Sequence, residues 1–176
     1  MKCMTWLLVV LALCALAASQ DRPKAELSLD YEFTHFWVSA NGESAGINLP
    51  AGGDASVNVP ITNFIGIVGE FSGATKTVNG DTGSIYIYGG GVQFTDRQNR
   101  IAQPFGKFVV GVGTLSAGVF GATDSETAFA FTVGGGVDIR LADHIYARGG
   151  VDYSHATKYG TGFNSIRPLG GISFKF

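Results

Sequence analysis

Cysteine is confined to the first 14 residues of this 176-residue sequence, at Cys3 and Cys14. Charged residues are also scarce, at 15% of the chain, where about a quarter is usual. The formal net charge is −2 and no cluster of Lys or Arg is present. These absences exclude a fold held by disulfide bonds and give no sign of a nucleic-acid partner.

Long apolar runs are missing beyond the N-terminal segment, so the sequence predicts no membrane-spanning helix, which needs about 20 apolar residues. Helical periodicity is equally hard to find. What the chain has instead is glycine, 26 residues of 176, about double the ordinary share. It also shows a recurring alternation of apolar with small or polar residues, which is typical of β-strands.

The first 19 residues have the layout of a secretory signal peptide. Lys2 precedes an apolar core at residues 6–16, and small residues follow, with cleavage expected near Ala17 to Ser19. An uncleaved membrane anchor is the alternative. Residues 20–176 are then predicted to form one exported domain without cysteine.

Eight segments of that domain alternate with period two. Most of them are longer than the roughly five or six residues of ordinary globular strands, and they match the roughly nine to eleven residues that a tilted strand needs to cross a bilayer. The predicted strands are residues 25–38, 54–60, 64–72, 84–94, 103–116, 126–140, 145–155 and 164–176.

The links between these segments differ in length. Short links are expected at residues 61–63, 95–102 and 141–144. Long links rich in Gly, Ser, Thr, Asn and Asp are expected at residues 39–53, 73–83, 117–125 and 156–163. Short turns at one end and long loops at the other predict the fold class: all-β, an eight-stranded antiparallel up-and-down transmembrane β-barrel.

The two faces of the strands decide between a membrane barrel and a soluble one. One face carries large apolar residues and the other carries Gly, Ala, Ser, Thr and a few charges, which favours lipid outside and a polar lumen. The alternative is a soluble or surface-attached, lipocalin-like barrel for a small ligand, with the apolar face inside. In the membrane barrel we expect a lumen charge network of Asp30, Glu32, Glu70, Lys107, Asp138, Arg148, Asp152 and Arg167.

Aromatic residues are expected in two belts at the two membrane interfaces. The belt beside the short turns comprises Phe64, Phe94, Phe105, Tyr146 and Phe176. The belt beside the long loops comprises Trp37, Phe71, Tyr86, Phe129 and Tyr153.

Residues that could carry catalysis or bind metal do not cluster. The three histidines, His35, His144 and His155, are not at metal-ligand spacing. Ser154 and His155 are adjacent in a strand and therefore point to opposite faces, so they should not form a nucleophile–base pair. No catalytic, cofactor or metal site is predicted, and the acidic residues Asp54, Asp81, Asp124 and Glu126 are interpreted as solvated loop charges.

The C-terminus "GGISFKF" carries a family resemblance. Phe176 is a terminal aromatic residue, Phe174 is apolar two positions earlier, and Gly171 lies three before that. In this the chain resembles the outer-membrane β-barrel family that includes the OmpA transmembrane domain, the OmpX-like proteins and porin-family barrel domains, although Leu169 stands where that family has a polar residue.

The resemblance implies a place in a bacterial outer membrane and contact with its lipid. It also implies that Gly171, Phe174 and Phe176 form an assembly signal read by the barrel-assembly machinery. We expect a non-enzymatic protein with a structural, surface-interaction or narrow-pore role and an extracellular partner bound through the long loops. An outer-membrane enzyme is a further alternative, because fold does not fix function.

Overall fold

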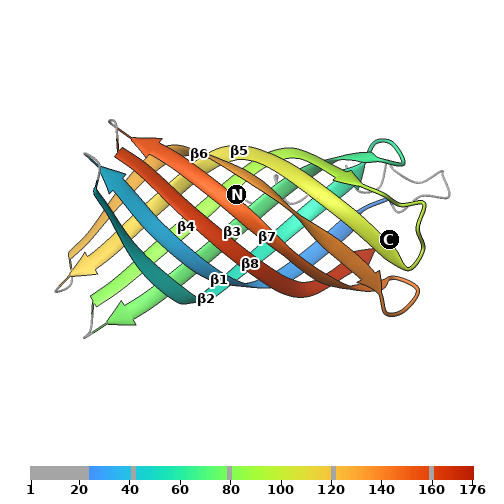
Figure 1. Cartoon of the computed structure of the whole chain (residues 1–176), viewed down its shortest axis with the longest axis horizontal. Helices are drawn as coiled ribbons and strands as arrows, with labels where there is room; N and C mark the ends of the chain where they lie inside the picture. The colour runs from blue at the N-terminus through green and yellow to red at the C-terminus, as the bar shows by residue number, and fades with distance from the viewer. Residues whose placement is uncertain (1–23, 41–42, 79–80, 120–121, 159–160) are drawn as a thin grey trace, which may run out of the picture.

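The computed structural model describes residues 24–40, 43–78, 81–119, 122–158 and 161–176. These residues form a closed barrel in which consecutive strands pair antiparallel and the last strand pairs with the first (Figure 1). The predicted fold class is therefore confirmed. The strands are β1 (Glu26–Ala40), β2 (Glu43–Pro60), β3 (Ile65–Val78), β4 (Asp81–Thr95), β5 (Ala102–Val119), β6 (Ala122–Arg140), β7 (Ile145–Lys158) and β8 (Thr161–Lys175).

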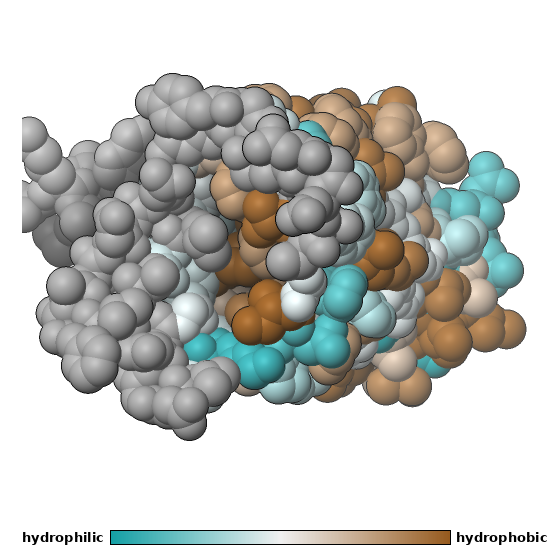
Figure 2. Space-filling view, turned by 60° about the vertical axis from the view of Figure 1, so that its left-hand side comes forward, coloured by the Kyte–Doolittle hydropathy of each residue, from teal (hydrophilic) through white to brown (hydrophobic). Residues whose placement is uncertain are grey.

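Alternation along each strand sets the two faces of the wall. In β1, Glu26 and Ser28 are buried, whereas Leu29 and Tyr31 point outward and are exposed. In the described residues no helix is present that is long and apolar enough to cross a membrane. The outer wall is instead covered by the large apolar residues of the strands, and apolar brown surface covers much of it in Figure 2.

The seam between β1 and β8 closes the barrel. Its register runs from Glu26 opposite Lys175 to Ser39 opposite Gly162, and the amide of Phe176 donates to Ala25 O at 2.9 Å. Each strand thus has a neighbour on both sides, which satisfies its backbone hydrogen bonds without water. The C-terminal strand pairs to its last residues because it is one side of this seam.

Three short turns lie at the end of the barrel where the chain finishes, on the right in Figure 1. Polar side chains fix two of these turns. The hydroxyl of Thr62 accepts from the amide of Ile65 at 2.9 Å, and Asn99 Oδ1 accepts from the amide of Ile101 at 2.9 Å. Such side-chain bonds to nearby amides are why Thr and Asn favour turns.

At the opposite end the expectation of four long loops is wrong. The strands continue through most of those segments, so that β2 begins at Glu43 and not at residue 54, and only two undescribed residues separate the strands in each hairpin. Gly, Ser, Thr, Asn and Asp suggested loops by composition, but pairing with the neighbouring strand overrides the weak β-propensity of Gly, Asn and Asp. β6 has 19 residues. At about 3.3 Å per residue and a tilt of about 40°, it rises about 45 Å, well beyond a hydrocarbon core of about 30 Å.

Two aromatic residues also differ from expectation. Phe105 is 7% exposed and Tyr146 is 8% exposed, so both point into the lumen and not toward lipid. Phe105 lies two residues from Lys107, and Tyr146 lies two residues from Arg148, so each pair must share a face. The other belt residues are exposed on the wall except Trp37, which is half-buried. The predicted signal peptide lies outside the described residues.

Gly171 lies at a close approach of β8 to β1. A Cβ atom on Gly171 would lie 2.6 Å from Asp30 Cα and would also overlap Leu29 O. A Cβ on Gly149, also in mid-strand, would meet nothing within 4 Å.

We therefore expect Gly171→Ala to lower the free energy of unfolding by about 1–3 kcal/mol through overpacking of the seam. Gly149→Ala should change it by less than about 1 kcal/mol. Urea unfolding of the protein refolded in detergent, followed by Trp37 fluorescence, measures both without any assembly machinery. Equal effects of the two substitutions would contradict the close approach at Gly171.

Candidate functional site

The lumen collects the ionisable side chains of the barrel. The eight residues predicted for the charge network are all buried, with exposed fractions from 0% to 7%. Glu26, Asp54 and Lys175 share this face but are not among the residues predicted for the charge network. Glu26 and Lys175 have the parity of the predicted lumen residues, so the alternation places them on this face.

A central ion-pair cluster crosses the lumen. Lys107 Nζ lies 2.6 Å from Glu70 Oε2 and 2.8 Å from Asp152 Oδ2. Arg167 lies 3.1 Å from Glu32 Oε1, 3.4 Å from Glu70 Oε1 and 3.5 Å from Asp152 Oδ2. These five residues come from β5, β3, β7, β8 and β1, so the cluster joins strands on several sides of the barrel.

Hydroxyl groups add to the partners of Arg167, although its buried Nε has no hydrogen-bond partner among the described residues. Its guanidinium donates to Ser72 Oγ and, at 3.0 Å, to Ser154 Oγ. Ser154 is also bonded to Thr132 Oγ1 at 2.7 Å. A buried guanidinium needs such partners because each unpaired donor in a dry interior costs free energy.

A basal cluster lies between the central cluster and the short turns. Asp138 Oδ1 accepts from Arg148 Nε at 2.8 Å, and Asp138 Oδ2 accepts from Arg148 Nη2 at 3.0 Å and lies 2.8 Å from Lys175 Nζ. Phe105 and Tyr146 lie against these cations, with ring centroids 4.3 Å from Arg148 Cζ and 4.4 Å from Lys175 Nζ. The two inward aromatic rings therefore stabilise the cations by cation–π contact.

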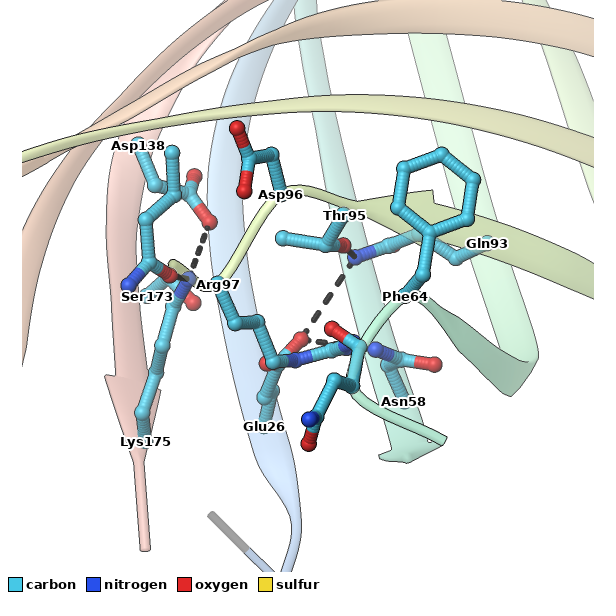
Figure 3. Close-up of polar contacts among 12 residues, drawn as sticks. Glu26, Asn58, Phe64, Gln93, Thr95, Asp96, Arg97, Asp138, Ser173 and Lys175 are labelled. Carbon is cyan, nitrogen blue, oxygen red and sulfur yellow. Dashed lines mark hydrogen bonds and ion pairs between the residues drawn. The ribbon is translucent and has the colours of Figure 1, made fainter. Parts of the chain in front are cut away.

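The turn between β4 and β5 closes the base of the barrel. Arg97 reaches from this turn to Glu26, with Nε 2.9 Å from Oε1, and Asn58 Nδ2 donates to the other oxygen of Glu26 at 2.6 Å (Figure 3). Arg97 also donates to Asn63 O at 3.2 Å, which ties two turns together. Alternation could not have predicted Arg97, because the direction of a turn side chain depends on the turn conformation.

Asp30 and Asp54 face each other across β1 and β2. Both are buried, and within the described ranges neither carboxylate has a hydrogen-bond partner. The interpretation of Asp54 as a loop charge is wrong because β2 extends through it. Asp81, Asp124 and Glu126 also lie within strands, in β4 and β6.

The three histidines and Ser154 have different hydrogen-bond partners. Ser154 points into the lumen, while the ring of His155 is bonded to Asn164 Oδ1 at 2.7 Å and Thr157 Oγ1 at 2.8 Å. His144 is bonded to Lys175 O and His35 to Asn48 Oδ1. No group of three or more metal-binding side chains occurs in the part of the chain that the structure describes.

The predicted assembly residues lie at the end of β8. Phe176 is exposed at the barrel rim, Phe174 is half-buried in the wall, and Gly171 lies at the seam. Leu169 points inward opposite Glu32 of β1 and Gly150 of β7. Recognition of this strand by assembly machinery stays a prediction.

A closed eight-stranded barrel with an apolar wall and a charged lumen is the architecture of an integral outer-membrane protein. The family model described as "Outer membrane protein beta-barrel domain" matches residues 5–174. The chain belongs to this family, and its location is the bacterial outer membrane. Short turns in such barrels face the periplasm, so the extended hairpins face outward.

Solved structures agree with this fold. Neisserial surface protein A is 15% identical, with a TM-score of 0.70 over 89% of this chain and 100% of that chain. Ail, the attachment invasion locus protein of Yersinia pestis, is 17% identical, with a TM-score of 0.57 over 86% and 99%. OprG from Pseudomonas aeruginosa is 10% identical, with a TM-score of 0.56 over 88% and 97%. No curated protein sequence matches the chain.

Two Arg–Asp pairs at the periplasmic half test how much the lumen contributes to stability. Arg148→Leu leaves Asp138 buried beside Lys175 alone, which should cost about 3–5 kcal/mol of unfolding free energy. Arg140 pairs with Asp143 at 2.6 Å in an exposed turn, and Arg140→Leu should cost less than about 1 kcal/mol. Urea unfolding in micelles measures both. A loss for Arg148→Leu no larger than that for Arg140→Leu would contradict the buried network.

Proposed function

We propose that this protein is a non-enzymatic outer-membrane barrel with a closed lumen, which acts through its stable wall and its outer hairpins and not as an open pore. The observation that carries the proposal is the central ion-pair cluster. It places Lys107 and Arg167 against three carboxylates from three other strands, across the path that a solute would take.

Opening this path would separate buried ion pairs. Moving Lys107 aside takes from the buried carboxylates of Glu70 and Asp152 the ammonium group that lies 2.6 Å and 2.8 Å from them. Breaking a buried pair in this way costs about 3–5 kcal/mol, which keeps an open state rare. Arg97 and Glu26 add a second closure at the periplasmic base.

A non-enzymatic role is supported by the placement of the polar side chains. The Ser154 hydroxyl is bonded to Thr132 and Arg167, whereas the ring of the neighbouring His155 is bonded to Asn164 and Thr157, so His155 is not placed to act as a base for Ser154. The buried carboxylates of the central cluster are held by Lys107 and Arg167 and are not presented at the outer rim.

The outer hairpins supply the surface for an extracellular partner. Their sequence carries Glu43, Asp81, Asp124 and Glu126 but only Lys76 and Lys158. One Ail structure contains a heparin analogue, sucrose octasulfate. The acidic hairpins of this chain do not favour such a sulfated ligand, and the partner we propose is neutral or cationic.

Conductance in planar lipid bilayers tests the closed lumen. The refolded wild-type protein should give no steady current, and Lys107→Ala should give resolvable openings because the central cluster then loses its bridge between β3 and β7. Arg140→Ala, which removes an exposed turn charge, should behave like wild type. Both variants are first checked for the fast migration of unheated barrel on a gel. Steady wild-type current equal to that of Lys107→Ala would overturn the proposal.

Heparin–agarose chromatography at low salt tests the charge of the outer surface. We expect the detergent-solubilised protein to pass through the column, because like-charge contact between acidic hairpins and sulfate groups is unfavourable. Retention that is reversed by moderate salt would contradict a neutral or cationic partner.

A further inference from the structure

The outer half of the lumen is apolar, although the interior of a membrane barrel is ordinarily polar. The change occurs directly outward of Arg167 and Ser154. From there outward, a cavity is lined by hydrocarbon side chains of β1, β4, β6, β7 and β8, together with the polar residues Thr114, His155 and Asn164. The main apolar residues of this zone are Phe36, Ile85, Ile87, Ala128, Ala156 and Phe163.

These side chains surround a cavity of about 50 Å³. Phe36 of β1 and Phe163 of β8 stack on one side, with ring centroids 6.3 Å apart, while Ile85 and Ile87 of β4 line another. Figure 2 shows brown hydrophobic atoms in the hollow at the hairpin end of the barrel. The cavity is therefore a partly open chamber with apolar walls.

Small residues keep this chamber empty. Eight-stranded barrels are normally just wide enough for side chains to fill the interior. Here a Cβ atom on Gly113 would lie at ordinary contact distances, 3.5 Å from Ala130 Cβ, 3.8 Å from Ala156 Cβ and 4.0 Å from Ile87 Cγ1. A larger residue at Gly113 would fit into space that the natural sequence leaves open.

The floor of the chamber is polar and closed. Ser154 and Ser165 line the floor. The hydroxyl of Ser154 is bonded to Arg167 of the central cluster and to Thr132 of β6. Ser165 is 3% exposed, and its hydroxyl makes no hydrogen bond within the described residues. An unused hydroxyl at the bottom of an apolar chamber is a specific donor or acceptor for one polar group.

We propose that this chamber is a binding site for a small aliphatic molecule that carries one hydroxyl or carbonyl group. The aliphatic part packs between Phe36, Phe163, Ile85 and Ile87, and the polar group bonds to Ser165. The enclosed volume is about a third of the roughly 150 Å³ that accommodates benzene, so it holds only the polar end and the first carbons of the molecule, and the rest of the chain extends into the open outer mouth. Because the central cluster closes the floor, the molecule enters and leaves through the outer mouth.

Methyl NMR with 1-hexanol as the probe tests this site in the full barrel, refolded in phosphatidylcholine nanodiscs. Isoleucine δ1 methyls report both environments, because Ile85 and Ile87 line the chamber whereas Ile67 and Ile172 face lipid. We expect saturable shifts at Ile85 and Ile87. The lipid-facing methyls should shift only in proportion to the alcohol dissolved in the bilayer.

Gly113→Leu fills the chamber and should abolish the saturable shifts. The matched control is Gly149→Leu, whose side chain points outward from β7 into open space, and it should retain them. Ala128→Leu is the second filling variant if Gly113→Leu does not fold. Ser165→Ala should weaken 1-hexanol binding about tenfold through loss of the hydrogen bond.

Non-saturating shifts at Ile85 and Ile87, or unchanged binding in the filling variants, would overturn the site. This outcome is independent of conductance, since a closed lumen does not require an occupied chamber. A barrel that conducts but still binds 1-hexanol would refute the closed lumen alone.

Discussion

The seam between β1 and β8 is the constraint on which the rest of this structure depends. Inside a bilayer an unpaired strand edge would leave a row of amide and carbonyl groups without partners, at a cost of several kcal/mol each. Pairing from Glu26 opposite Lys175 along the length of the seam removes both edges. Closure in turn forces every second side chain into a narrow lumen, where the polar residues must find partners in one another.

The lumen meets this requirement in two different ways along its length. In the periplasmic half, the central and basal clusters pair Lys107, Arg148, Arg167 and Lys175 with carboxylates. In the outer half, small and aliphatic residues need no partners and leave a chamber. The first arrangement stabilises a closed barrel, and the second provides space above it. The buried carboxylates of Asp30 and Asp54, which have no hydrogen-bond partner among the described residues, lie in the periplasmic half.

Much of this follows from parity in the sequence. Alternation identified the strands and the inward-facing charges, because neighbouring residues in a strand must face opposite sides. The same rule contradicts the lipid-facing placement of Phe105 and Tyr146, which share parity with Lys107 and Arg148. Both residues were assigned to the lipid-facing belt because they lie near short turns, but the alternation of the strand determines which way their side chains point.

Other features were outside the reach of sequence patterns. The extension of β2 back to Glu43 depends on pairing with β1, which local composition does not encode. The contact of Arg97 with Glu26 depends on a turn conformation. Which charges pair across the lumen depends on barrel geometry, so the cluster members were predictable but their partners were not.

A double-mutant cycle between Lys107→Met and Glu70→Gln, measured by urea unfolding in micelles, tests the central cluster most directly. Their contact at 2.6 Å in the buried lumen predicts a coupling free energy of about 2–3 kcal/mol. A coupling within about 0.5 kcal/mol of zero, as found for independent sites, would contradict a lumen closed by this ion pair.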